Sequence, residues 1–432
     1  MQNGRAQNLK VAVLTAFDSH EKLAAALVHA CPNTSEVNWF YSSSALNRMH
    51  DEQVAELHER RHFEKFDFEK SCFSSIASRH DVFIVSLPGR DVEKSISLIR
   101  EIQYEQKFDQ KIIVSGFAGL LYSNRYGALE TRLGSDIICV NSENDYQDFR
   151  DYLIKSNREL YIDSLVRTGF VIADKSLSDN LNCEFSPDNK PHSILFAEQP
   201  DVPNAIYERQ YVAEQLIALA EKNPDLNIVI KPRLKKGYAT FHKSLKSIAE
   251  IIQQSIGPIP KNIKIDYSNI NDLILNTDLV CSISSTAIVE GVLSGKFVAC
   301  ISDFGLREPY GTHAFVGSGF LTRIVNLTNL MEPNRNWIEM NCGFQSKPSE
   351  VVKQRIQNLL TNAPLNFPPL RLVDATYNPP LFNKRHEKDT YKKSRNLGSG
   401  SKLSWWTIKL SYLERQLEKL GKKYSKYLRN AK

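Results

Sequence analysis

Hydrophobic runs of five to seven residues recur through the first part of the chain, and charged or amphipathic segments separate them. Such runs predict strands that are buried on both faces of a parallel sheet, here at residues 10–15, 37–41, 81–87, 111–115 and 136–140. The segments between and after them have helical patterns, at 21–30, 51–68, 92–106 and 144–155. Asp18 is expected to open the first helix, with Glu21 as its capping-box partner. This alternation predicts a mostly parallel α/β sheet with right-handed crossovers.

The pattern is interrupted at residues 174–192, which are polar and rich in turn-forming residues, and it then starts again. We interpret this segment as a linker between two domains. The second series predicts strands at 193–197, 226–231, 263–266, 279–282 and 297–301, and helices at 205–222, 242–255, 270–276 and 350–361. The expected domains are residues 1–185, residues 186–365 and a C-terminal extension, 366–432.

Two successive open α/β units predict a GT-B-like layout, in which two Rossmann-like domains have parallel sheets that face a central cleft. The same pattern also fits other two-domain α/β enzymes and periplasmic-type binding proteins. Residues 1–10 are polar and lack the apolar core of a secretory signal, which counts against the periplasmic type.

Composition narrows the class of protein further. The 432 residues are 42% hydrophobic, which is enough for two full-sized cores. No apolar run approaches the roughly 20 residues that cross a bilayer. The seven cysteines form no metal-ligand spacing, and Cys139, Cys281 and Cys300 lie in apolar runs where buried thiols are common. We therefore expect a cytoplasmic location and no metal site.

Charge is concentrated at the C-terminus. Residues 384–432 carry 15 Lys and Arg against 4 Asp and Glu, a net charge of +11, so the rest of the chain carries −5. A domain-wide nucleic-acid surface does not fit this balance. Residues 403–420 have leucines and a tryptophan at helical spacing. A basic amphipathic helix of this kind suits an anionic membrane surface, which residues 403–432 would contact at the inner face of the cell membrane. It would equally suit packing on a protein.

The segment 278–300 carries the strongest chemical signal. It predicts a strand, a hydroxyl-rich turn with Ser284, Ser285 and Thr286, a helix and a second strand. Backbone N–H groups at a helix N-terminus beside a strand's carboxyl end favour a phosphate. Glu290 lies one helical turn after Thr286 and would accept hydrogen bonds from ribose hydroxyls. The alternative interpretation is an ordinary N-capping run.

Other polar residues follow neighbouring strands of the second domain. Lys231 and Arg233 end one strand, and His242 lies in the loop after it, so these side chains would bind a departing phosphate. Gln199, after another strand, is expected to face the donor, and so is Asp303. A solvated basic loop and a rigid polar turn are the structural alternatives.

In the first domain, Asp18 and His20 are candidates for the base that takes a proton from an acceptor hydroxyl. Asp18 would otherwise be a helix cap alone, and His20 an exposed side chain. Ser115 ends a predicted strand and Gly116 follows it, and both would line the acceptor side, because glycine there often permits a close backbone approach.

The order of these elements resembles an uncharacterised bacterial family of GT-B-type glycosyltransferase or sialyltransferase-like proteins, over about residues 9–345. The matching elements are Asp18-Ser19 with Lys22, Val114-Ser-Gly116, Phe196-Ala-x-Gln199 with Pro203 and Glu208-Arg209, Lys231-x-Arg233 with Gly237 and Thr240-x-His242, Ser284-Ser-Thr-Ala-x-x-Glu290, and Asp303-Phe-Gly305. The serine turn also resembles the paired hydroxyls with which bacterial sialyltransferases and capsule Kdo transferases hold a CMP phosphate. Those families pair it with a His-Pro motif, where this chain has Lys231-Pro-Arg233.

The resemblance implies an inverting, metal-independent glycosyltransferase that modifies a cell-surface glycan or a lipid-linked acceptor. Its implied co-substrate is a nucleotide-activated sugar, with a CMP-linked nonulosonic (sialic acid-like) sugar or CMP-Kdo favoured, and it needs no cofactor. One alternative is a transferase that uses a UDP- or GDP-sugar. Another is a non-catalytic protein that binds a glycan or nucleotide.

Overall fold

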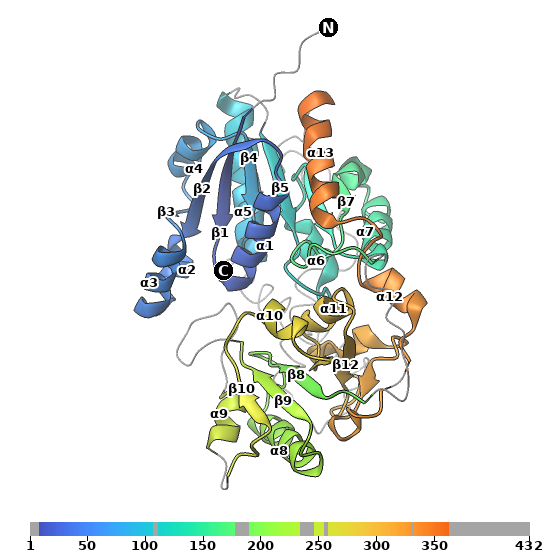
Figure 1. Ribbon diagram of the computed structural model, residues 1–432. Coiled ribbons are helices and arrows are strands. Elements are labelled where there is room, and N and C mark those ends of the chain that lie inside the picture. The colour runs from blue at the N-terminus through green and yellow to red at the C-terminus, as the bar shows by residue number, and fades with distance from the viewer. Residues whose placement is uncertain are drawn as a thin grey trace, which may run out of the picture. The chain divides into compact units, whose positions relative to one another are not determined.

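The computed structural model describes residues 8–106, 111–177, 190–233, 246–254, 258–330 and 332–362. Two parallel sheets organise these residues (Figure 1). The predicted linker lies partly outside the described residues. His242 and the predicted helix at 403–420 lie wholly outside them.

The first sheet has seven parallel strands in the order β3-β2-β1-β4-β5-β6-β7. This order is that of a Rossmann fold, and it reverses between β1 and β4, where such sheets bind ligands beyond the carboxyl ends of their strands. The strands are β1 (Leu9–Thr15), β2 (Thr34–Ser42), β3 (Glu64–Phe66), β4 (Val82–Val85), β5 (Ile112–Gly116), β6 (Ile137–Val140) and β7 (Leu165–Arg167).

Helices cover both faces of this sheet, which explains its continuous apolar strands. In β1, Ala12 and Leu14 pack in one core cluster, whereas Val11 and Val13 pack in another. Both faces are therefore buried, as the apolar run predicts. The helices are α1 (Asp18–His29), α2 (Ser43–Leu46), α3 (Asp51–Arg60), α4 (Lys70–Ala77), α5 (Gly89–Gln106), α6 (Arg125–Glu130), α7 (Glu143–Lys155) and the 3-10 helix η1 (Glu159–Ser164).

The second sheet has six parallel strands in the order β10-β9-β8-β11-β12-β13, which repeats the Rossmann order. Its order reverses between β8 and β11. The strands are β8 (Ser193–Ala197), β9 (Asn227–Lys231), β10 (Ile263–Ile265), β11 (Leu279–Ser282), β12 (Phe297–Ile301) and β13 (Leu321–Thr322). The predicted GT-B-like pair of Rossmann-like sheets is confirmed.

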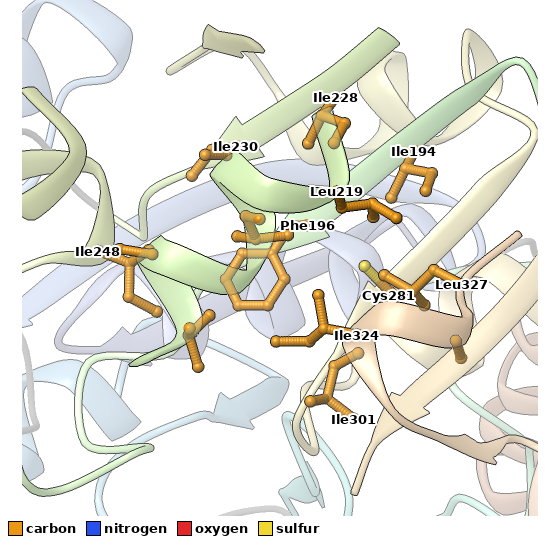
Figure 2. Packing of buried hydrophobic residues seen from close by; sticks show 14 of the residues in the cluster. Ile194, Phe196, Leu219, Ile228, Ile230, Ile248, Cys281, Ile301, Ile324 and Leu327 are labelled. Carbon is orange, nitrogen blue, oxygen red and sulfur yellow. The ribbon is translucent and has the colours of Figure 1, made fainter. Parts of the chain in front are cut away.

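One core cluster of the second sheet is mostly aliphatic. Figure 2 shows Phe196 of β8 among the side chains of Ile248, Ile230 and Ile324. The helices of this half are α8 (Ile206–Lys222), α9 (Ile248–Gln253), α10 (Ile270–Leu275), α11 (Ala287–Val292) and α12 (Arg335–Asn341), with 3-10 helices η2 (Glu308–Tyr310), η3 (Thr312–Phe315) and η4 (Ile324–Asn326).

The helix α13 (Pro348–Asn362) follows the second sheet in sequence and packs with the first. Its buried Val352, Ile356 and Leu359 share a core cluster with Leu27 of α1 and Val13 of β1. The prediction placed this helix within 186–365. The boundaries 1–185, 186–365 and 366–432 stay a prediction. The core of the first sheet, however, contains residues that come before the second sheet in the sequence and residues that come after it.

Some predicted elements were wrong in detail. The helix predicted for 51–68 ends at Arg60, and Glu64–Phe66 form β3, because Phe66 is buried beside Ser42 of β2. The capping box at Asp18 is absent: Phe17 is the N-cap, and no side chain caps the helix. Glu21 instead forms an ion pair with Arg61, at 3.0 Å. The short strands β7 and β13 were not predicted.

Cys139, Cys281 and Cys300 are free and buried, as predicted, and burial raises the pKa of each thiol. In the described part of the chain, no helix is long and apolar enough to cross a membrane.

Candidate functional site

The predicted donor residues gather where the second sheet reverses its strand order. Gln199 follows β8, Arg233 follows β9, and Ser284 follows β11. Because β8 lies between β9 and β11, these residues share one edge of the sheet. Ligands of open α/β sheets bind at such an edge.

Gln199 fixes the first serine of the turn. Its Oε1 accepts a hydrogen bond from the backbone N–H of Ser284 at 2.9 Å, and its Nε2 donates to Ser284 Oγ at 3.2 Å. Ser282 Oγ also lies 3.3 Å from Gln199 Oε1. Ser284 is buried, so these bonds set the turn's backbone rather than offering its hydroxyl to solvent.

The next two residues are half-buried, and their hydroxyl groups are hydrogen-bond acceptors in this structure. Ser285 Oγ accepts from the backbone N–H of Ala287 at 3.2 Å, and Thr286 Oγ1 accepts from that of Leu120 at 3.3 Å. A hydroxyl that accepts one hydrogen bond still has its own proton to donate. Ser285 and Thr286 can therefore donate two O–H groups to an anion.

The turn contributes to capping and also contacts another loop. Thr286 is the N-cap of α11 and its own side chain makes no capping hydrogen bond, whereas Ser285 Oγ accepts from the N–H of Ala287, the first residue of the helix. The hydroxyl of Thr286 contacts the loop after β5 instead, where a Cβ added at Gly119 would lie 2.7 Å from Thr286 Oγ1. A residue larger than glycine at 119 would thus displace Thr286.

Two cations lie at the end of β9. Burial and the neighbouring Arg233 lower the pKa of Lys231, whose Nζ donates to the carbonyl of Pro232 at 2.9 Å. Arg233 is exposed, and its Nη2 lies 2.7 Å from Asp18 Oδ2. The predicted leaving-group cation and the predicted base therefore form an ion pair with each other.

Asp18 is the first residue of α1, at the carboxyl end of β1. His20 lies in the same turn, and its carbonyl accepts from Ser86 Oγ at 2.7 Å. Ser86 follows β4, so both base candidates lie where the first sheet reverses its strand order.

A second ion pair extends from the same helix. Lys22 lies one turn after Asp18, and its Nζ is 2.9 Å from Glu290 Oε2. The Glu290 side chain is only 8% exposed, whereas that of Lys22 is 34% exposed. Residues four apart share a helix face, so one face of α1 contacts two predicted donor residues, Arg233 and Glu290.

Other predicted site residues have internal roles. Ser115 is fully buried, with its Oγ 2.9 Å from Ser135 Oγ, and the carbonyl of Gly116 accepts from Arg132 Nε at 2.7 Å. The buried Asp303 carboxylate accepts from the Tyr211 hydroxyl and the Ile324 N–H, each at 2.9 Å. Among the described residues, these bonds do not reach the serine turn, Lys231 or Arg233.

No metal site accompanies these groups in the part of the chain that the structure describes. There, no three or more His, Cys, Asp or Glu side chains lie together in a metal-binding arrangement. Among the described residues, the charged groups of the site are Asp18, Lys22, Lys231, Arg233 and Glu290.

Residues 11–359 match the family described as "Putative glycosyltransferase (DUF6716)". The chain belongs to this family. No curated protein matches the sequence of this DUF6716 family member.

Solved structures resemble this DUF6716 family member in fold. The UDP-GlcNAc 2-epimerase of Methanocaldococcus jannaschii, in complex with UDP-GlcNAc and UDP, has a TM-score of 0.50 at 15% identity, over 82% of this chain and 99% of that one. A protein from Listeria monocytogenes described as a "putative UDP-N-acetylglucosamine 2-epimerase" has a TM-score of 0.49 at 14% identity, over 87% of this chain and 100% of that one. A sialyltransferase from Photobacterium phosphoreum has a TM-score of 0.38 at 14% identity, over 75% and 100%.

Sequence reasoning missed three partners of the site in this DUF6716 family member: the contact of Leu120 with Thr286, the pairing of Lys22 with Glu290, and the bonds that Arg209 makes around Gln199. The spacing of Asp18 and Lys22 is a signal that would have linked them to one helix face. Arg209 follows Glu208 in a motif that carried the family resemblance, but its role depends on contacts that the sequence does not reveal.

Proposed function

We propose that the chain is an inverting, metal-independent glycosyltransferase that uses a nucleotide-activated sugar. The observation that carries this proposal is the pair of available hydroxyl protons on Ser285 and Thr286, at the edge where Lys231 and Arg233 supply positive charge. Membership of a glycosyltransferase family and the GT-B-like fold support it.

In the proposed reaction, the donor phosphate binds between the serine turn and the two cations. The bond between the sugar's anomeric carbon and the phosphate oxygen breaks, and the nucleotide leaves with the bond's electron pair. Arg233 and Lys231 stabilise the developing charge together with the two hydroxyls, which is the electrostatic task of such a site. These cations and hydroxyls, rather than a metal, neutralise the leaving group.

Asp18 is the proposed base. The acceptor hydroxyl attacks the anomeric carbon from the face opposite the phosphate, a new bond forms between that carbon and the acceptor oxygen, and the hydroxyl proton passes to the Asp18 carboxylate. Asp18 pairs with Arg233 in this structure. A phosphate that binds Arg233 would release Asp18 for the acceptor. His20, in the same turn, is the alternative base.

For the donor, we keep a CMP-linked nonulosonic (sialic acid-like) sugar or CMP-Kdo as the first candidate, on the resemblance of the serine turn. A UDP-sugar is the second candidate, because the Methanocaldococcus jannaschii protein of similar fold binds UDP-GlcNAc and UDP. Glu290 is the proposed ribose contact for either nucleotide and would exchange its bond with Lys22 for ribose hydroxyls. The proposed acceptor is a surface glycan or a lipid-linked glycan, with residues 403–432 at an anionic membrane.

Nucleotide binding and donor turnover test this proposal. Calorimetry with CMP, UDP and GDP, and release of nucleotide from the matching sugar donors, identify the donor class. The double variant Ser285→Ala/Thr286→Val removes both hydroxyl donors and is expected to weaken binding of the preferred nucleotide at least about 100-fold, since hydrogen bonds to charged groups contribute a net of about 1.5–3 kcal/mol each.

Thr277→Val is the matched control. Thr277 lies two residues before β11, at the end opposite the serine turn, and its Oγ1 donates to the carbonyl of Leu273 at 2.9 Å. This variant is expected to bind nucleotide like the wild type. Unchanged affinity in the double variant, or full activity after the further change Arg233→Ala, would reject the phosphate site. Tight glycan binding without turnover of any donor would favour a non-catalytic protein.

A further inference from the structure

Arg209 is a buried arginine in the first turn of α8, and its side chain is only 1% exposed. Its Nη1 lies 2.9 Å from Glu198 Oε1. Its Nε donates to the carbonyl of Pro203 at 2.9 Å, and its Nη2 donates to that of Gln199 at 3.1 Å and to that of Pro200. The guanidinium group therefore binds a carboxylate and three carbonyls of a single loop, 198–203.

This loop contacts the serine turn through Gln199. Gln199 is bound through its carbonyl by Arg209, and through its side chain it binds both the backbone N–H and the hydroxyl of Ser284. A glutamine side chain has three rotatable torsions, so its amide presents both atoms to Ser284 only if its backbone is fixed. A supporting shell of this kind decides whether a binding group is correctly oriented.

Two neighbours fix Arg209 itself. Glu198 Oε1 also accepts from the backbone N–H of Ile248 at 2.7 Å, which joins the loop to the start of α9. Glu208, adjacent in sequence, accepts from Arg307 Nη1 at 3.0 Å and from the Tyr310 hydroxyl. The first turn of α8 is thus anchored to the loops after both β8 and β12, on the two sides of β11.

We propose that Arg209 is a positioning residue of the donor site, which holds the 198–203 loop so that Gln199 fixes Ser284, without touching the donor. The donor part of this inference rests on the proposed function. A lysine at 209 would keep the positive charge beside Glu198. One ammonium group cannot reproduce the planar fork that binds several carbonyls at once.

Arg209→Lys tests the inference, with hydrogen exchange of the Ser284 amide and nucleotide affinity as readouts. We expect amide exchange to be about tenfold faster, and affinity for the preferred nucleotide among CMP, UDP and GDP to fall about tenfold. In a Gln199→Ala background, Arg209→Lys is expected to weaken affinity by less than about threefold more, because residues that act through one contact are not additive.

Arg100→Lys is the matched control. Arg100 is also buried, its Nη2 lies 2.7 Å from Asp136 Oδ2, and it also donates to the carbonyls of Gly134 and Lys111. Those residues precede β5 and β6, at the amino ends of the first sheet's strands. Arg100→Lys is expected to lower the melting temperature but to leave Ser284 exchange and nucleotide affinity unchanged.

The inference would be overturned if the Ser284 amide of Arg209→Lys exchanged at the wild-type rate. It would also be overturned if the effects of Arg209→Lys and Gln199→Ala on nucleotide affinity were additive. If Arg209→Lys does not fold, Glu198→Gln weakens the same contact with an isosteric side chain and is expected to speed Ser284 exchange in the same direction. If the wild type binds no nucleotide, the proposed function fails, and the exchange rate alone still decides the role of Arg209.

Discussion

Asp18→Asn is expected to change turnover and donor affinity in opposite directions. The substitution keeps the size of the side chain and removes its charge. As the proposed base, Asp18 takes the proton of the acceptor, and loss of a general base typically lowers kcat about 10²- to 10⁴-fold. The uncharged amide would also release Arg233 from an ion pair that competes with the donor phosphate.

The exposure of the pair sets the size of the affinity gain. The Arg233 and Asp18 side chains are 43% and 36% exposed, so their pairing belongs to the weak, solvated class. Such pairs contribute about 0.2–1 kcal/mol. Removing the competitor is therefore expected to strengthen nucleotide binding by at most about fivefold. Asp18 makes no capping hydrogen bond in α1. If Asp18 acted only on the stability of the helix, neither kcat nor nucleotide affinity would change.

Steady-state donor turnover gives kcat, and calorimetric titration with the nucleotide gives its affinity. Glu36→Gln is the control, because Glu36 forms another exposed ion pair of the first sheet, with Lys10 at 3.1 Å. It is expected to leave both quantities unchanged. An unaltered kcat in Asp18→Asn would show that another group, such as His20, is the base. Equal or weaker nucleotide binding would refute the competition for Arg233.

Two further predictions concern the charges around the site. Because burial and Arg233 lower the pKa of Lys231, raising the pH from about 7 to about 10 is expected to weaken nucleotide binding in the wild type but not in Lys231→Arg. The expected direction follows from the charge, because a deprotonated lysine no longer attracts phosphate. Calorimetry across this pH range measures nucleotide affinity, and the same pH dependence in both proteins would contradict the prediction. Lys22→Met leaves the Glu290 carboxylate buried without its cation and is expected to lower the free energy of unfolding by about 1–3 kcal/mol. The double variant Lys22→Met/Glu290→Gln is expected to recover much of this loss in urea unfolding, and an additive loss would show that the two residues are not coupled.

The fold was predictable from the sequence because most strands are apolar on both faces. The runs at β1, β4, β8 and β11 stand out against their polar surroundings, and the helix patterns between them are long. The strands that were not predicted are short. Glu64 and Lys65 of β3 are exposed, so that only Phe66 marks the strand, and β13 has two residues. Their positions depend on pairing with β2 and β12, which local sequence does not encode.

The candidate site was predictable only as far as strand ends determine it. The strand-end rule brought together Gln199, Lys231 and the serine turn, because the carboxyl ends of parallel strands meet at one edge. The strand-end rule does not predict in which direction a side chain points. Asp303 follows β12 as expected, yet its carboxylate turns inward to the Ile324 N–H. The pairing of Asp18 with Arg233 depends on how residues of the two sheets meet, and residue spacing carries no signal for it.

The ion pairs of α1 also bear on the order of events at the proposed site. In this structure, Arg233 binds the Asp18 carboxylate, whereas the Lys231 ammonium binds only a carbonyl among the described residues. A phosphate that replaces Asp18 exchanges one anion for another, so Arg233 never has to lose its counter-charge when the donor binds. The same exchange frees the Asp18 carboxylate. Because the exposed pair contributes at most about 1 kcal/mol, a bound donor would raise the availability of the base by no more than about fivefold. Initial-rate kinetics are therefore expected to show that a bound donor lowers the KM of the acceptor by up to about fivefold in the wild type but not in Arg233→Ala, and an equal effect in both proteins would contradict this coupling.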